Sequence, residues 1–145
     1  MHTTILLIAL CAFTSARAGG LENLNQVDLV ELEPRTSQLQ LLVLLEDDRV
    51  NTKQAMKALF RKVNNYQDFI NSGQALAVAP NSSQKLRPVV VLVAPREATS
   101  GELQNLAGLK LAALRAGAEV EVRPYIAGIK ARPVAIRPPR AASGA

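Results

Sequence analysis

Apolar and polar residues follow two different periods along the middle of this chain. Residues 38–46 (QLQLLVLLE) begin with alternation and become continuously apolar, and residues 87–94 (RPVVVLVA) form a β-branched apolar run. Both patterns are typical of strands that are buried on two faces. Residues 119–123 (EVEVR) alternate strictly, which predicts a half-exposed strand closed by Pro124. The short apolar run at residues 75–79 (ALAVA) is a candidate edge strand.

Two segments between these strands have the period of an amphipathic helix. The first helix is expected to begin near Asn51, whose side chain can cap it, and to end at Gly73. The second is expected to begin at a capping box that includes Thr99 and Glu102, and to end at Gly117. The predicted inner face of the first helix consists of Met56, Leu59, Phe60, Val63, Tyr66 and Ile70, and Lys53, Lys57, Arg61 and Lys62 fall largely outside it. The predicted inner face of the second consists of Leu103, Ala107, Leu111 and Leu114, flanked by Leu106 and Ala113.

The order strand, helix, strand, helix, strand predicts crossover units, which form parallel sheets with right-handed connections. We therefore expect an α/β fold with a small, mostly parallel sheet of three to four strands and two crossover helices. This domain is expected to span residues 37–128. An acidic lead-in would precede it over residues 19–36. The basic tail at residues 129–145 is rich in proline and arginine and is expected to be extended and largely disordered.

Residues 1–18 have the pattern of a cleaved signal peptide. An apolar run without a charge at residues 5–13 (ILLIALCAF) is followed by the small-x-small triplet Ala16-Arg17-Ala18. The run is too short for a bilayer span, which needs roughly 20 apolar residues, so we expect cleavage after Ala18. The alternative is a buried N-terminal strand or helix. No second apolar stretch is long enough for a transmembrane anchor, so the sequence predicts a secreted, extracellular protein.

Cleavage there would remove Cys11 and His2, the only cysteine and the only histidine. The mature protein would then have no disulfide, and Ser-His-Asp triads, Cys-His dyads and zinc sites built from histidine or thiolate would be excluded. No glycine-rich phosphate loop of the G-x-G-x-x-G or G-K-[ST] type occurs, and no cofactor is expected. Carboxylate chemistry, a Lys or Tyr base and a hard-cation site remain open.

Charge is distributed unevenly along the chain, which carries 17 Lys and Arg residues, 12 Asp and Glu residues and a net charge of +5. Between residues 19 and 48 a single base, Arg35, stands against the acids Glu22, Asp28, Glu31, Glu33, Glu46, Asp47 and Asp48. From residue 123 onward there is no acid, and the bases are Arg123, Lys130, Arg132, Arg137 and Arg140. The basic end could attract the acidic segment, bind an acidic partner or serve only solubility.

Charged residues follow the predicted strands at their carboxyl ends, where open α/β sheets bind ligands. Glu46, Asp47 and Asp48 follow the first strand, and Arg96 and Arg123 follow the later ones. These residues predict an acid–base rim. Asp47 and Asp48 are candidate ligands of Mg²⁺ or Ca²⁺, and Arg96 and Arg123 are candidate contacts for a polar ligand. The alternative is a set of surface charges that pair with one another.

Two further features point to an extracellular role. Asn81-Ser82-Ser83 is the only N-x-[ST] sequon and lies in a predicted loop, so glycosylation of Asn81 is expected. The tail resembles insect-type proline-arginine antimicrobial peptides in composition. Because no aromatic residues interleave with its charges, it is expected to bind a polyanionic surface rather than nucleic acid. The candidate contacts in the tail are Lys130, Arg132, Arg137 and Arg140.

Parts of the chain resemble two known α/β families. Residues 41–60 (LLVLLEDDRVNTKQAMKALF) and 114–125 (LRAGAEVEVRPY) resemble the beginning and the end of a response-regulator receiver domain. This resemblance implies Asp47 and Asp48 as magnesium ligands, but no strand between the two segments ends in a phosphate-accepting aspartate. Residues 87–122 are similar to a late strand–helix–strand unit of a von Willebrand factor A domain, whose Asp-x-Ser-x-Ser metal motif is absent here. Both resemblances imply the fold and neither assigns a function.

The sequence therefore favours a secreted, non-enzymatic binding protein whose partner is an extracellular protein or a polyanionic surface. A second hypothesis is a precursor that releases its basic C-terminal segment as a cationic defence or signalling peptide. A third is a metal-dependent enzyme that uses Asp47 and Asp48. The oligomeric state stays open.

Overall fold

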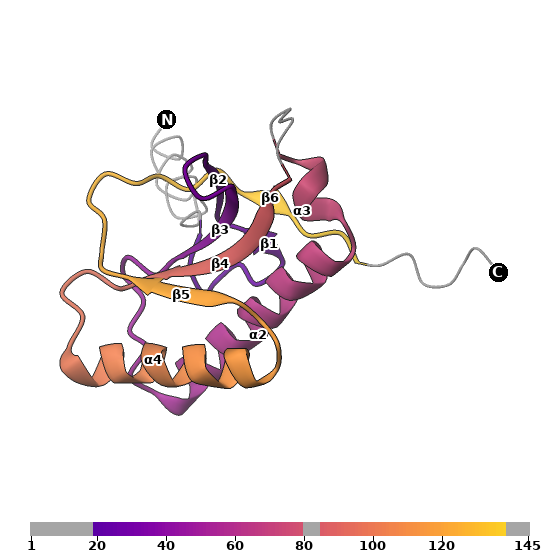
Figure 1. The fold of residues 1–145 in the computed structure, drawn as a ribbon. Helices are drawn as coiled ribbons and strands as arrows, with labels where there is room; N and C mark the ends of the chain where they lie inside the picture. Colours follow the sequence, from indigo (N-terminus) through magenta and orange to yellow (C-terminus); the bar gives the residue numbers. More distant parts are fainter. Residues whose placement is uncertain (1–18, 80–84, 139–145) are drawn as a thin grey trace, which may run out of the picture.

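A computed structural model describes residues 19–79 and 85–138 (Figure 1). These residues form a mixed α/β fold with a four-stranded sheet in the order β2-β3-β4-β5, and β1 and β6 form a separate antiparallel pair. The strands are β1 (Gln26–Val27), β2 (Leu29–Glu33), β3 (Gln38–Leu44), β4 (Arg87–Val93), β5 (Val120–Arg123) and β6 (Val134–Ala135). The helices are α2 (Lys53–Asn71), α3 (Gln74–Ala77) and α4 (Ser100–Arg115). The predicted α/β class is confirmed.

The two predicted crossover units are present. Strand β3 pairs in parallel with β4, and β4 pairs in parallel with β5, whereas β2 and β3 are antiparallel. Both crossovers step in the same direction along the sheet, so right-handed connections place α2 and α4 on the same face, as Figure 1 shows. The core between this face and the helices includes Leu41, Val90, Leu92, Tyr66 and Leu106. No helix within the described residues is long and apolar enough to cross a membrane.

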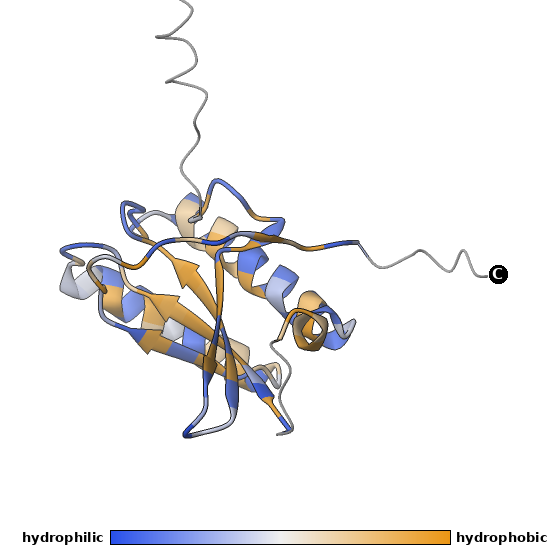
Figure 2. Cartoon of the chain, turned by 90° about the horizontal axis from the view of Figure 1, so that it is seen from above, coloured by the Kyte–Doolittle hydropathy of each residue, from blue (hydrophilic) through white to orange (hydrophobic). Residues whose placement is uncertain are grey.

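The other face of the sheet is covered differently. Its apolar part consists of Leu29, Leu42, Leu44, Val89, Val91 and Val93, all buried. Ile129 and Ala131 pack against this cluster. They belong to residues 124–138, which we call the strap because it runs over the sheet on the side away from α2 and α4 (Figures 1 and 2). The two central strands of the main sheet, β3 and β4, are predominantly apolar, and strands of this kind appear orange in Figure 2.

Both segments that the sequence analysis placed outside the domain contribute strands to it. The predicted lead-in, residues 19–36, contains β1 and the edge strand β2. The described part of the predicted tail, residues 129–138, contains β6, which pairs with β1. The amide of Arg132 donates to the carbonyl of Asp28 at 2.7 Å, and the amide of Ile136 donates to that of Asn25 at 2.9 Å. Residues 129–138 are therefore ordered by backbone pairing, and residues 139–145 lie outside the described part.

One predicted strand and one predicted helix cap need correction. The run at residues 75–79, a candidate edge strand, instead contributes to the short helix α3. Gly73 has a left-handed φ of 85°, which lets one residue end α2 and act as N-cap of α3. The cap of α2 is Thr52 rather than Asn51, and its hydroxyl accepts the amide of Ala55 at 3.1 Å. The capping box of Thr99 and Glu102 is confirmed.

The predicted inner face of α4 was wrong in its central residues, and only the flanking Leu106 and Ala113 are buried. Leu103, Leu111 and Leu114 are 44%, 56% and 64% exposed. The helix instead buries Glu102, Leu106, Leu109 and Ala113. In α2 the inner face is largely as predicted, but Phe60 is 44% exposed and Lys62, expected outside it, is fully buried. Both helices carry a polar residue on the buried face because that residue is bound by backbone groups of the surrounding loops, as described next.

Candidate functional site

Two residues of the predicted acid–base rim, Glu46 and Arg96, meet at the carboxyl edge of the sheet. Glu46, just after β3, forms an ion pair with Arg96, just after β4. The hydroxyl of Tyr125 lies 3.3 Å from Glu46 Oε1, and the guanidinium of Arg96 lies 5.3 Å from the centre of the Tyr125 ring. The amide of Arg96 also donates to the Glu46 carbonyl at 2.8 Å. The hydrogen bond that Arg96 donates to the Glu46 carboxylate raises the pKa of Arg96 above its ordinary value, so the ion pair stabilises the charged form of the arginine.

The two candidate metal ligands, Asp47 and Asp48, are not members of this ion pair. Asp48 Oδ2 accepts the amide of Leu21 at 3.1 Å, and the Asp48 amide donates to the Leu45 carbonyl at 3.0 Å. Asp47 is exposed and adds to the electrostatic stabilisation of the Arg96 cation. Within residues 19–79 and 85–138, no group of three or more His, Cys, Asp and Glu side chains is arranged to hold a metal ion. The described residues thus place no third carboxylate, imidazole or thiolate beside Asp47 and Asp48.

Arg123 faces away from this rim and lies across the sheet. Its Nη1 donates to Gln40 Oε1 at 3.1 Å, and its Nη2 lies 3.1 Å from Glu121 Oε2. Gln40 belongs to β3 and Arg123 to β5, so the bond between them crosses β4, which separates the two strands. The arginine side chain thus extends over β4. Arg96 and Arg123, predicted to share a rim, are each occupied by different partners.

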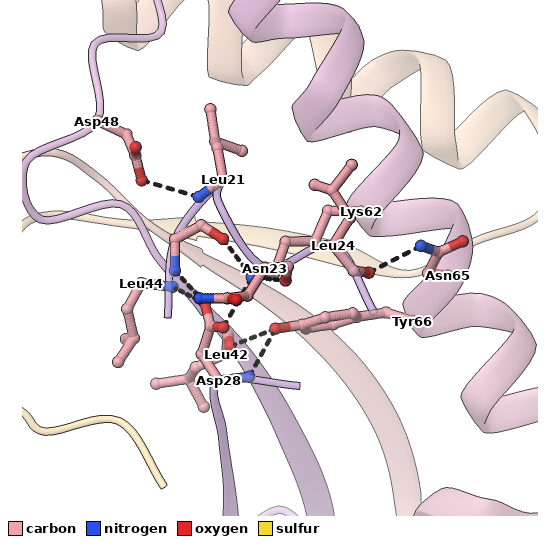
Figure 3. Close-up of polar contacts among 11 residues, drawn as sticks. Leu21, Asn23, Leu24, Asp28, Leu42, Leu44, Asp48, Lys62, Asn65 and Tyr66 are labelled. Atoms are coloured by element: carbon pink, nitrogen blue, oxygen red, sulfur yellow. Dashed lines mark hydrogen bonds and ion pairs between the residues drawn. The ribbon is translucent and has the colours of Figure 1, made fainter. Parts of the chain in front are cut away.

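Sequence reasoning missed a buried cluster where α2, β3 and the N-terminal segment meet, shown in Figure 3. The side chains of Asp28, Lys62 and Tyr66 are fully buried. Lys62 Nζ lies 2.7 Å from Asp28 Oδ1 and also donates to the carbonyl oxygens of Gly20 and Asn23. Because all three side chains are shielded from solvent, we assign them a structural role.

The carboxylate of Asp28 also accepts backbone hydrogen bonds, which tie three segments together. Its Oδ2 accepts the amides of Gly20 at 3.0 Å and of Leu44 at 2.9 Å. The Asp28 amide donates to the hydroxyl of Tyr66 at 2.9 Å, and that hydroxyl donates to the carbonyl of Leu42 at 2.9 Å. The N-terminal segment, β3 and α2 therefore meet at one carboxylate.

The titration of this cluster follows from its burial. Burial raises the pKa of the Asp28 carboxyl above its ordinary value, although Lys62 and two backbone amides act in the opposite direction. Burial and the neighbouring Asp28 raise the pKa of Tyr66 well above its ordinary value, so its hydroxyl remains a donor at neutral pH. A sequence signal for Lys62 did exist, because this residue lies three positions after Leu59 and four before Tyr66, on the same side of the helix.

Gly19 and Gly20 enter the same cluster through their backbones. Both residues are buried and have left-handed φ values of 91° and 79°. A Cβ atom added to Gly19 would lie 3.3 Å from Asp28 Cγ and 3.4 Å from Ala131 Cβ. The chain therefore passes between Asp28 and the strap at a place where a side chain would be both strained and crowded.

A second buried carboxylate, Glu102, joins the start of α4 to the loop before α2. One oxygen accepts the amide of Thr99 at 3.0 Å, and the other accepts the amide of Val50 at 3.0 Å. Arg49 lies 3.4 Å from the first oxygen. The bond from Thr99 is the main cause that lowers the pKa of Glu102 below its ordinary value. This explains why an acid occupies the buried face of α4.

The predicted binding residues of the tail lie on the strap. Lys130, Arg132 and Arg137 are exposed, and Arg140 lies outside the described residues. Lys130 and Arg132 border a groove between the strap and the edge strand β2, which Glu31 and Val78 also line. The side-chain amide of Gln74 holds the end of the strap, because it donates to the carbonyl of Arg137 at 3.0 Å and accepts its amide at 2.9 Å.

Asn81, the predicted glycosylation site, and residues 1–18, the predicted signal peptide, also lie outside the described residues. Comparison of the chain with protein-family models, with curated proteins and with solved structures finds no match. The resemblances to receiver and von Willebrand factor A domains thus gain no support. Any function must be inferred from the residues of this chain.

Proposed function

We propose that this protein is secreted and acts as a non-enzymatic binding protein that contacts a polyanionic extracellular surface through its strap. The observation that carries the proposal is the difference between two groups of cations. Arg96 and Arg123 are paired with neighbouring side chains. In contrast, the side chains of Lys130, Arg132 and Arg137 form no ion pair or hydrogen bond with any other residue in the described part of the chain.

The strap presents these free cations from a fixed backbone. β6 is paired with β1, the amide of Arg132 is bound to Asp28, and Gln74 holds the backbone of Arg137. Lys130 and Arg132 are two residues apart, which in an extended chain corresponds to roughly 7 Å. A fixed set of charges loses less conformational entropy on binding than a flexible tail would. Glu31 in the adjoining groove opposes anion binding locally, so we expect contacts on the outer side of the strap.

The same backbone bonds favour an intact chain over the alternative of a peptide precursor. Cleavage near Gly128 would remove β6 from β1, and Ile129 and Ala131 from the apolar cluster of the sheet. It would also leave the side chain of Gln74 without its two backbone partners. Release of the tail would therefore disrupt the domain that remains.

A charge-matched comparison on immobilised heparin tests the proposal. The variant Lys130→Gln, Arg132→Gln, Arg137→Gln removes three charges from the strap. The control Lys53→Gln, Lys57→Gln, Arg61→Gln removes three exposed charges from α2. We expect the strap variant to elute at clearly lower salt. Its affinity should also depend less steeply on salt, because a protein that makes fewer charge contacts releases fewer counterions on binding. The control should elute near the unmodified protein.

Two results would contradict the proposal. One is absence of salt-sensitive retention of the unmodified protein, and the other is an equal loss of retention in both variants, which would indicate attraction by net charge alone. Secretion is tested separately by N-terminal sequencing of protein recovered from the medium of expressing cells. The expected first residue is Gly19, and recovery of the protein only from cell lysates would refute export.

A further inference from the structure

The exposed leucines of α4 form a continuous apolar flank. Leu103, Ala107, Leu111 and Leu114 follow one another at spacings of four, four and three residues, and all four are exposed. This is the spacing of one side of a helix. Leu103, Leu111 and Leu114 are each more than two fifths exposed. A helix with a second apolar side of this length has a surface suited to a protein neighbour.

The flank is on the side of α4 that is turned away from α2. Asn105 Nδ2 donates to the carbonyl of Val50, in the loop that leads into α2, at 2.7 Å. At about 100° per residue, Leu103 and Leu114 lie roughly 160–180° around the helix from Asn105. Figure 1 shows α4 beneath β5, with α2 farther back. The leucine flank therefore borders β5, the outermost strand on this side of the sheet.

The backbone of β5 is open on that same side. The carbonyls of Glu119 and Arg123 accept the amides of Val90 and Ala94 at 3.2 Å and 2.8 Å, so these odd-numbered residues bond toward β4. In a parallel pair, the intervening residues of an edge strand direct their N–H and C=O groups outward. Val120 and Val122 thus present unpaired backbone groups beside the leucine flank, within the described part of the chain.

From this arrangement we infer that the protein forms a twofold-symmetric homodimer in which β5 pairs antiparallel with β5 of a second copy. A twofold axis at Val122 places Glu121 opposite Arg123 of the second copy and the reverse. These two opposite-charge pairs lie on the face without helices, where Glu121 and Arg123 are about one third exposed and pair with each other within one copy. On dimerisation Arg123 would exchange its contacts with Glu121 and Gln40 of its own copy for Glu121 of the second copy. An axis at Glu121 would instead oppose two glutamates. That register would also place Arg123 opposite Glu119, so the register centred on Val122 is distinguished by having opposite-charge pairs and no like-charge pair.

The remaining features of the edge suit a closed pair rather than an open-ended assembly. Strand β5 has only four residues, and Pro124 after it lacks an N–H group, which limits the ladder to a short segment. Below the joined strands the same axis brings the two leucine flanks together. Lys110 and Arg115, both exposed, adjoin this flank, and their long side chains can extend past the leucines into water. In the dimer, β5 and α4 of the second copy thus lie beside β5, where the sheet of a larger α/β protein would continue.

Light scattering coupled to size-exclusion chromatography tests the dimer on the secreted protein. We expect twice the monomer mass at tens of micromolar. Glu121→Arg and Arg123→Glu should each raise the dissociation constant by about tenfold or more, since each creates two like-charge pairs. The double variant Glu121→Arg, Arg123→Glu should restore dimerisation, a recovery that mere misfolding would not give. Thermal unfolding of each variant checks that the fold is retained.

A leucine pair provides an independent test of the helix flank. Leu114→Glu should yield a monomer, whereas the control Leu76→Glu, which places the same charge on an exposed leucine of α3, should remain dimeric. A monomer at all concentrations up to about 1 mM would overturn the inference. A dimer whose dissociation constant is unchanged in Glu121→Arg and Leu114→Glu would overturn it as well, because the contact would then lie elsewhere.

Discussion

The ion pair between Asp28 and Lys62 gives the sharpest prediction for stability. Lys62→Met removes the ammonium group from Asp28 and from the carbonyls of Gly20 and Asn23, and leaves a buried carboxylate with two amide donors. Loss of one partner from a buried ion pair costs about 3–5 kcal/mol. We therefore expect the free energy of unfolding to fall by about that amount, which is a large part of the stability of an ordinary domain.

The measurement is urea-induced unfolding followed by far-UV circular dichroism. Lys57→Met is the control, because it makes the same change at an exposed position of the same helix and should alter stability by no more than about 0.5 kcal/mol. Asp28→Asn should cost a similar amount to Lys62→Met. The double variant should cost less than the sum of the two by about 0.5–3 kcal/mol, because the two groups interact directly. A cost below about 1 kcal/mol for Lys62→Met, or strictly additive single effects, would refute this account of the cluster.

Three further outcomes follow from Glu102 and from two glycines. Because backbone bonds lower the pKa of folded Glu102, its contribution is present above the pKa of an unfolded glutamate, about 4.3, and is lost as the pH falls through the folded value. Glu102→Gln should therefore weaken the acid dependence of the urea midpoint, and an unchanged dependence would contradict this. In the uncleaved chain, where Gly19 still follows Ala18, Gly19→Ala should destabilise the fold by about 1–2 kcal/mol, since φ is 91° and Asp28 Cγ is 3.3 Å from the added carbon. Gly108→Ala, in open space within α4, should stabilise it by about 0.5–1 kcal/mol in the same unfolding assay, and a loss of stability would count against that placement.

Local patterns in the sequence were sufficient for the central part of the fold. The run at residues 87–94 and the box of Thr99 and Glu102 predicted β4 and the start of α4 because they depend on neighbours within a few positions. The run at residues 75–79 failed because a short apolar stretch fits a strand or a helix equally well. This stretch became the helix α3 because the left-handed turn at Gly73 starts a new helix there.

The errors in the helix faces have a different origin. Helix α4 has apolar residues on two sides, so its sequence alone could not tell which side is buried. The sequence analysis assigned Glu102 to the capping box and did not include it in the inner face, although that carboxylate is bound by the amides of Thr99 and Val50. Val50 is 52 residues away in the chain, and such a partner leaves no local signal.

The candidate site shows the same limit. The pairing of Glu46 with Arg96 was one of the alternatives considered at the rim, because the carboxyl ends of parallel strands share an edge. The cluster of Asp28 and Lys62 joins residues 34 positions apart and was not predicted. The strap was misjudged for a related reason. Its prolines and arginines indicate an extended chain correctly, but its order depends on backbone bonds to residues 25–28 and to Gln74.

The burial of Gly19 and Gly20 has a consequence for maturation. If the leader is cut after Ala18, Gly19 becomes the first residue, and its free ammonium group arises beside the enclosed Asp28 and Lys62. A third charged group would then lie near an ion pair whose two opposite charges already cancel. Because this cluster joins the N-terminal segment to β3 and α2, the position of the cut would determine which charges the domain encloses.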